Sequence, residues 1–225
     1  MPRKPTPALS SKPAPRPAAK PVRQPTSAAP SRLHEIRIIG GQWRRSRLPV
    51  ADRPGLRPTP DRVRETLFNW LASRAGVGGG ELPGWQCLDL FAGTGALGFE
   101  AASRGASAVT LCEQEPSLAA QLQATCERLH AEAVQVHRGD GVARLERMAA
   151  GSLHVVFVDP PFEQSALYQR ALRAAVPALR PDGVIYLEAD KAWDADALAP
   201  HGLQVLRHLR AGAVHGHLLA AVSAA

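Results

Sequence analysis

After Gly84, short apolar runs alternate regularly with longer amphipathic stretches. The apolar runs are typical of strands and cover residues 86–91, 108–113, 133–137, 153–158 and 183–188. Helical periodicity occupies the intervals between them, at 96–104, 116–130, 141–149 and 165–179. This alternation predicts β-α-β crossovers, and therefore a parallel sheet that carries helices on both of its faces.

The end of the chain departs from this alternation. The stretches "LQVLRHLRAG" and "AVHGHLLAAV" are typical of two strands around Ala211-Gly212, with no helix between them. Strands that are joined so closely must be antiparallel. We therefore predict a Rossmann-like α/β domain in which a mostly parallel, seven-stranded sheet ends in an antiparallel hairpin.

The first 32 residues differ in composition from the rest. They contain nine prolines and seven lysines or arginines but no acid, which predicts a disordered, Pro/Ala-rich basic tail. This tail accounts for the whole net charge of +7. We expect it to be followed by a small N-terminal segment (33–80) and by the α/β domain (81–225).

The N-terminal segment is expected to consist of a β-hairpin and a helix. Residues 35–50 are typical of a hairpin around Gly40-Gly41, and residues 57–71 of an amphipathic helix. Thr59 is expected to cap this helix and Pro60 to occupy its first position.

A glycine-rich loop follows the first strand of the α/β domain in "CLDLFAGTGALGFEAA". Gly93, Gly95 and Gly98 complete a formal G-x-G-x-x-G pattern, and Glu113 ends the next strand 18 residues beyond Gly95. This pattern nearly matches the dinucleotide-binding fingerprint, so an NAD-dependent oxidoreductase remains one interpretation.

Asp89 favours a different ligand. It lies four residues before Gly93 at the strand end, where its charge would repel a pyrophosphate and hold the cationic amino group of S-adenosylmethionine. Asp140 in "HRGDG" is placed to accept a hydrogen bond from an adenine amino group, and Glu113 suits ribose hydroxyls. The alternative interpretation is that Asp89 and Asp140 only cap turns.

The fourth strand of the α/β domain ends in "VDPPF". Its Asp159 leaves the sheet at the edge where the glycine loop lies. An exocyclic amine is a poor nucleophile, and the Asp159 carboxylate and the Pro160 carbonyl could accept its two N–H bonds. Pro161 restricts the preceding residue, and Phe162 could stack on the base. The alternative is that Pro160-Pro161 only ends a strand and Phe162 packs in the core.

An arginine-rich region precedes the α/β domain. From Arg37 to Arg74 there are nine arginines against three acids. Phosphate contacts from arginine and base stacking on an aromatic ring are typical of RNA recognition. We expect the RNA-binding residues to be Trp43, Arg44, Arg45, Arg47, Arg57 and Arg64. A solvated arginine surface without a partner is the alternative.

Four segments together resemble the bacterial 16S ribosomal RNA (guanine 966)-N2-methyltransferases, a family of class I S-adenosylmethionine-dependent enzymes. They are "RIIGGQWRRSRLPV", "GLRPTPDRVRETLFNWL", "LDLFAGTGALGFEAASRGA" and "VFVDPPF". The resemblance implies that residues 159–162 take the target base and that Thr59 and Arg62 border the cofactor pocket. The full set of expected cofactor residues is Thr59, Arg62, Asp89, Phe91, Gly93, Thr94, Gly95, Leu97, Glu113, Gln114, Asp140 and Gly141.

The expected partner is 16S ribosomal RNA or a small-subunit assembly particle, and the expected location is the cytoplasm. An adenine-N6 methyltransferase acting on DNA or RNA, and a non-catalytic RNA-binding protein, are the other interpretations. Cys87, Cys112 and Cys126 lack metal-site spacing, so we expect no metal and buried, reduced thiols. No apolar run is long enough for a membrane span. A single domain with one basic face fits a monomer.

Overall fold

The computed structural model describes residue 1 and residues 34–51, 58–161 and 165–222. Residues 33–225 form one compact unit, so the N-terminal hairpin and helix belong to the same unit as the sheet. The predicted tail lies outside the described residues, apart from Met1. Phe162 and Arg57 also lie outside them.

A seven-stranded sheet forms the centre of this unit, in the order β5-β4-β3-β6-β7-β9-β8. The strands are β3 (Gln86–Asp89), β4 (Ala108–Glu113), β5 (Val134–Arg138), β6 (Leu153–Val158), β7 (Leu179–Ala189), β8 (Leu203–Ala211) and β9 (Val214–Ala221). Strand β9 is antiparallel to both of its neighbours, whereas β3 to β7 pair in parallel. The predicted fold, including the C-terminal hairpin, is confirmed.

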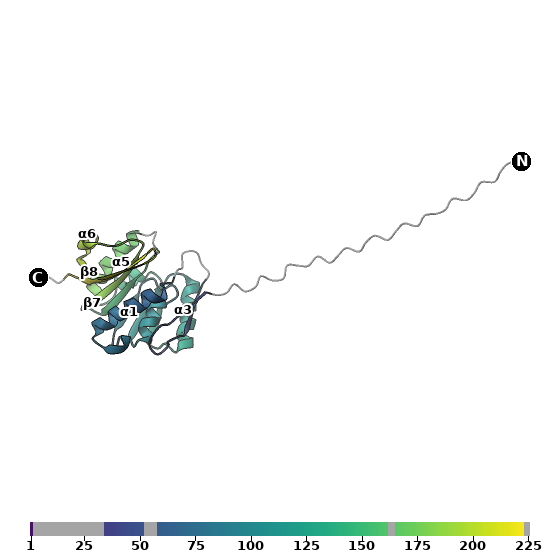
Figure 1. The fold of residues 1–225 in the computed structure, drawn as a ribbon, viewed down its shortest axis with the longest axis horizontal. Helices are drawn as coiled ribbons and strands as arrows, with labels where there is room; N and C mark the ends of the chain where they lie inside the picture. The colour runs from purple at the N-terminus through teal and green to yellow at the C-terminus, as the bar shows by residue number, and fades with distance from the viewer. Residues whose placement is uncertain (2–33, 52–57, 162–164, 223–225) are drawn as a thin grey trace. The chain divides into compact units, whose positions relative to one another are not determined.

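Helices cover both faces of the sheet, and each face has its own apolar cluster. One cluster contains side chains of α1 (Asp61–Ala75), α2 (Ala96–Ser103) and α3 (Pro116–Leu129). The other contains side chains of α4 (Gly141–Leu145), α5 (Ser165–Ala178) and α6 (Ala195–Leu198). Figure 1 shows α1 and α3 apart from α5 and α6. Two short 3₁₀ turns, η1 (Gly78–Gly80) and η2 (Ala199–His201), complete the structure.

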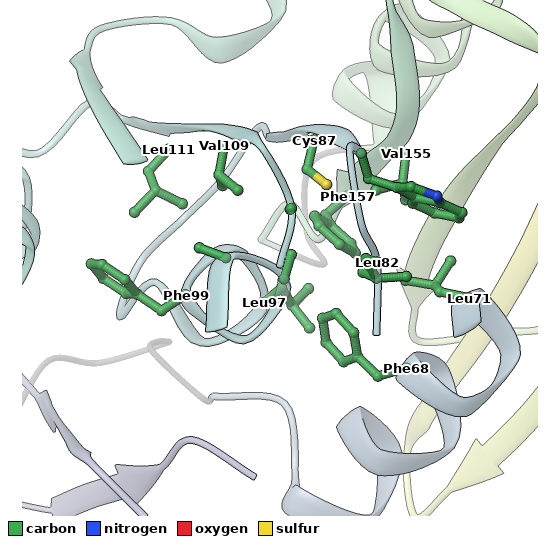
Figure 2. Close-up of a cluster of buried hydrophobic side chains, with 14 of the residues drawn as sticks. Phe68, Leu71, Leu82, Cys87, Leu97, Phe99, Val109, Leu111, Val155 and Phe157 are labelled. Atoms are coloured by element: carbon green, nitrogen blue, oxygen red, sulfur yellow. The ribbon is translucent and has the colours of Figure 1, made fainter. Parts of the chain in front are cut away.

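The apolar stripe of α1 joins the N-terminal segment to the sheet. Phe68 is fully buried, and its ring centroid lies 6.1 Å from that of Phe157 in β6. Figure 2 shows Phe68 of α1 and Leu97 of α2 below Phe157, while Phe99 of α2 lies on the side of Leu111. Helix α1 therefore packs on the strand that precedes Asp159.

The predicted hairpin is confirmed as β1 (His34–Arg37) and β2 (Arg47–Val50), which pair antiparallel. Its turn is held by Glu100 of α2, whose carboxylate accepts hydrogen bonds from the backbone N–H of Ile39 (2.7 Å) and Gly40 (2.8 Å). Glu100 is fully buried and also binds Arg104 Nε at 2.8 Å. A buried carboxylate therefore anchors the hairpin to the domain.

Several element boundaries differ from the prediction. Helix α1 begins at Asp61. Pro60, predicted at the first helical position, is instead the N-cap residue with an extended backbone (ψ 148°), and no side chain caps the helix there. The predicted capping role of Thr59 is therefore wrong, and its buried hydroxyl bonds to Glu188 instead.

Two later elements also have different lengths. Helix α4 is shorter than expected and ends at Leu145. Strand β7 is longer and begins at Leu179, although it contains Pro181. Its pairing with β6 shifts register between Leu153 and Val155, and such an irregularity is where a strand tolerates proline.

The C-terminal hairpin places β8 at one edge of the sheet. The pairing of β8 with β9 shifts register between Val205 and Arg207, so the edge strand is bulged. Gly212, in the turn, has φ +65°. Within the described ranges, no helix is long and apolar enough to cross a membrane.

Candidate active site

The order of the strands reverses between β3 and β6. From β3 the chain proceeds outward through β4 to β5, and then returns to place β6 on the other side of β3. Because β3 and β6 are parallel, Asp89 at the end of β3 and Asp159 directly after β6 leave the sheet at the same edge. Open α/β sheets bind their ligands at such a reversal, outside the carboxyl ends of the strands. The predicted placement of these two carboxylates is confirmed.

Asp89 is only 2% exposed and holds both ends of the glycine loop. Its Oδ2 accepts a hydrogen bond from the backbone N–H of Gly98 at 3.2 Å, and Phe91 N–H also donates to it. Burial raises the pKa of Asp89 to about 7, and the nearby charges of Glu113 and Glu188 add to this effect. Burial disfavours the ionised form of a carboxyl group, and a cationic ligand beside it would favour that form.

The glycine loop adopts a conformation that requires glycine. Gly95 has φ +77°, and a Cβ there would lie 2.5 Å from the Phe99 ring. Gly93 has φ +51° and donates its N–H to Glu113 Oε2 at 2.9 Å. Glu113 Oε1 accepts a second bond from Glu115 N–H at 2.8 Å, so this carboxylate fastens the loop to the end of β4. A ribose contact of Glu113 remains a prediction.

Asp140 caps α4, which was the alternative interpretation of this residue. Its Oδ1 accepts hydrogen bonds from the N–H of Val142 (2.8 Å) and Ala143 (3.1 Å), and its Oδ2 lies 2.9 Å from Arg170. Gly141 permits a close approach of α4 to the end of β3, since a Cβ there would lie 2.3 Å from the Leu90 carbonyl oxygen. The adenine contact of Asp140 remains a prediction beside this structural role.

The other predicted cofactor residues differ in their access to solvent. Thr59, Thr94 and Leu97 are each 4% exposed, and Phe91 is partly buried. Gln114 and Arg62 are exposed. Arg62 lies on the outward side of α1, as expected from the helical spacing of the buried residues around it.

Asp159 is partly buried, Pro160 is buried and Pro161 is exposed. Burial, together with the negative charges of Glu188 and Asp89, raises the pKa of Asp159 well above its ordinary value. The carboxyl edge between β3 and β6 is therefore acidic and poorly hydrated, which suits the stabilisation of a positive charge.

Glu188 is a residue of this edge that the sequence prediction missed. It follows the buried run Val184–Leu187 in β7, as Asp159 follows the buried run of β6, and it is 3% exposed. Its Oε1 accepts a hydrogen bond from the Tyr186 hydroxyl at 2.9 Å. The signal that could have identified Glu188 is the one that identified Asp159, namely an acid at the end of an apolar strand.

The hairpin carries three of the predicted RNA contacts on its surface. Arg44, Arg45 and Arg47 are exposed, and Arg47 pairs with Glu35 at 2.8 Å. Trp43 is partly buried against the apolar cluster of α1 and α2, and its backbone N–H donates to Ser103 Oγ at 2.9 Å. The hairpin therefore presents a basic surface and a partly buried tryptophan ring.

The prediction that Arg64 contacts RNA is wrong. Its side chain is fully buried and donates to the backbone oxygens of Thr59 (3.2 Å) and Arg37 (2.8 Å) and to Asp61 Oδ1 (2.6 Å). Its Nη1 lies 3.5 Å from Glu100 Oε2. Arg64 therefore joins α1, the hairpin and α2 in the interior. Arg57 lies outside the described residues, so its predicted role stays a prediction.

The three cysteines lie in the interior of the protein. Cys87, Cys112 and Cys126 are buried and unpaired, which confirms the expectation of free thiols. Among the described residues, no three His, Cys, Asp or Glu side chains are grouped to hold a metal ion.

A doubly wound sheet with a glycine loop and an acid after its first strand, and with Asp-Pro-Pro at the reversal, defines a Rossmann-like methyltransferase. The family model described as "Conserved hypothetical protein 95" matches residues 36–220. The chain belongs to this family.

Relatives with established names support the same class. "Ribosomal RNA small subunit methyltransferase D" of Escherichia coli (strain K12) is 45% identical over 158 residues, which are 69% of this chain and 75% of the relative. The protein of the same name from Haemophilus influenzae is 37% identical over 191 residues, 82% of this chain and 93% of the relative. The solved structure of Escherichia coli yhhF is 35% identical, with a TM-score of 0.69, over 84% of this chain and all of that chain. The protein is therefore a methyltransferase.

Proposed function

We propose that this protein methylates the exocyclic N2 amine of a guanine in small-subunit ribosomal RNA, at guanine 966 of the 16S RNA, with S-adenosylmethionine as the methyl donor. The observation that carries the proposal is the position of Asp89 and Asp159 on neighbouring parallel strands at the reversal of the sheet. Close relatives are named small-subunit ribosomal RNA methyltransferases, which supports this substrate over a nicotinamide substrate or RNA binding without catalysis.

The residues at the end of β3 fit S-adenosylmethionine. Burial and the nearby acids Glu113 and Glu188 raise the pKa of the Asp89 carboxyl, and the ligand's cationic amino group would favour its ionised form. The loop at Gly93 and Gly95 lets the backbone approach the ligand's carboxylate closely. When bound, this donor supplies a methyl group on a sulfonium, which is electrophilic enough for direct displacement.

Asp159 and Pro160 would act on the target amine. The Asp159 carboxylate and the Pro160 carbonyl accept the two N–H bonds, which draws the nitrogen toward a tetrahedral shape and frees its lone pair. The lone pair forms the new N–C bond while the electrons of the S–C bond remain on sulfur. The excess proton on nitrogen then passes to Asp159. Positioning and electrostatics supply the rate, and no metal is needed.

The exposed arginines of the hairpin would bind the RNA backbone. Arg44, Arg45 and Arg47 extend from a hairpin that Glu100 anchors to the methyltransferase domain. Phosphate contacts of this kind orient the substrate without selecting a base. The choice of guanine therefore belongs to the carboxyl edge of the sheet. A cytoplasmic monomer that acts on the RNA or on an assembly particle completes the proposal.

The test is transfer of a labelled methyl group to 16S RNA and to small-subunit particles that lack the modification. Digestion of the product to nucleosides should give N2-methylguanosine. The variant Asp159→Asn should lose at least about 100-fold in single-turnover rate, whereas Asp182→Asn, at an exposed position, should retain it. N6-methyladenosine in the product would favour the adenine alternative, and full activity of Asp159→Asn would refute the mechanism.

A further inference from the structure

Three carboxylates lie on one face of three neighbouring strands. In the register of the sheet, Asp89 pairs with Phe157, and Phe157 pairs with Tyr186. Asp159 directly follows Val158, the last residue of β6, so continuing this register past Val158 and Leu187 brings Asp159 beside Glu188. Because side chains alternate between faces, both point to the side where Phe157 and Tyr186 lie, under α1.

Glu188 is held in place by two hydroxyl groups. The Tyr186 hydroxyl donates to its Oε1 at 2.9 Å, and the Thr59 hydroxyl, from the segment just before α1, also donates to it. Both bonds favour the ionised carboxylate, and they act against the burial that raises the pKa of Glu188. A buried acid with two dedicated donors is built to hold a negative charge in one position.

We propose that Glu188 is a positioning residue for methyl transfer: it lies beside Asp159 on the neighbouring strand, and its negative charge, held by two hydroxyl donors, acts on the reacting amine through Asp159. The proposal rests on the function proposed above. Only an ionised Asp159 can take the excess proton from the methylated nitrogen. Once both acids are ionised, they together stabilise the positive charge that moves from sulfur to nitrogen.

Among the described residues, the titratable neighbours of the pair come from β3, β7 and α5, and none of them is a cation. Asp89 faces it from β3, and Tyr186 lies next to Glu188 on β7. From α5, the charges of Asp159, Asp190 and Glu188 act on Tyr168, whose buried hydroxyl has no hydrogen-bond partner among the described residues. The charges that act most strongly on Asp159 are those of Glu188 and Asp89. Removal of one negative neighbour should therefore lower the pKa of Asp159.

The variant Glu188→Gln tests this role, because it keeps the shape of the side chain and an oxygen for Tyr186 but removes the charge. Single-turnover methyl transfer should be measured across pH with saturating RNA. We expect the plateau rate at high pH to fall about ten-fold. We expect the acid limb to move to lower pH by about one pH unit. The deficit should then shrink as the pH falls, while the KM for RNA stays unchanged.

Two further variants separate this role from a structural one. Glu65→Gln, on the exposed side of α1, is the matched control and should behave like the parent protein. Tyr186→Phe removes one donor but keeps the charge, so its acid limb should not move to lower pH as that of Glu188→Gln does. An equal deficit of Glu188→Gln at every pH, or no deficit, would overturn the proposal.

A second measurement does not depend on the substrate. Carbon-13 NMR of labelled aspartate carboxyls should show the Asp159 titration at lower pH in Glu188→Gln than in the parent protein. An unchanged titration would overturn the proposal even if methyl transfer to ribosomal RNA occurs. Conversely, a shifted titration without any methyl transfer to the RNA would reject the proposed function and leave the coupling of Glu188 to Asp159 in place.

Discussion

The variant Glu100→Gln should destabilise the protein strongly, because Glu100 compensates two buried arginines. Its carboxylate binds Arg104 Nε at 2.8 Å and lies 3.5 Å from Arg64 Nη1, which has no hydrogen-bond partner in the described part of the chain. It also accepts the backbone N–H of Ile39 and Gly40. A glutamine would remove the charge and turn an amide donor toward groups that are themselves donors.

The magnitude follows from these contacts. Loss of one member of a buried ion pair costs about 3–5 kcal/mol, since the remaining charge is left uncompensated. In a unit of this size, 1 kcal/mol corresponds to about 2–4 °C in Tm, so we expect a loss of about 10 °C. Equilibrium urea unfolding and calorimetry would measure both quantities.

Glu65→Gln makes the same chemical change at an exposed site and should cost less than about 0.5 kcal/mol. Glu100→Gln combined with Arg104→Met should cost less than the sum of the two single changes, because the side chains are in contact. A loss below about 1 kcal/mol for Glu100→Gln would show that the buried arginines do not depend on this carboxylate.

Three other expectations follow from the interior. The folded-state pKa of Asp89 is raised to about 7, so its ionisation destabilises the ligand-free protein increasingly as the pH rises from 4 to 7. Asp89→Asn should therefore raise Tm more at pH 8 than at pH 5. The same variant should abolish the thermal shift produced by S-adenosylmethionine. A Cβ at Gly98 would lie 2.0 Å from Leu111 Cδ2, so Gly98→Ala should cost about 1–3 kcal/mol in urea unfolding, and a neutral result would show that α2 can move away from β4. Burial lowers the pKa of His217 to about 4, so on acidification the unfolded chain binds a proton at a higher pH than the folded protein does. The free energy of unfolding should therefore fall between pH 6.5 and 4, and less steeply in His217→Gln. Equal slopes in the two proteins would contradict this cause.

The parts of the fold that the sequence predicts are those with a local signal. The alternation of apolar runs and helices after Gly84 is repeated often enough to define the sheet. The glycine loop and the strand-ending acids Asp89 and Asp159 follow directly from it, because parallel strands present their carboxyl ends at one edge. Helix boundaries such as Asp61 depend on side-chain partners distant in sequence, as the Thr59 hydroxyl shows.

Arg64 illustrates the limit of such reasoning. It is adjacent in sequence to the buried Val63, and as an arginine it was assigned to the surface and to RNA. It is buried because Glu100 and the carbonyl of Arg37, 36 and 27 residues away, surround its guanidinium. For Glu188, the sequence indicates the position at the end of a strand but not the proximity to Asp159. Only the pairing of β6 with β7 places it beside Asp159.

The bulged outer strand β8 has a consequence for the behaviour of the protein in concentrated solution. An open strand at the side of a sheet is a template on which another chain can add, and continued addition leads to fibres. Here the shifted register near Val205, together with the exposed cationic side chains of Arg207 and Arg210, disfavours a flat, uncharged partner. The strand that contributes least to the chemistry thus helps keep each molecule separate from its copies.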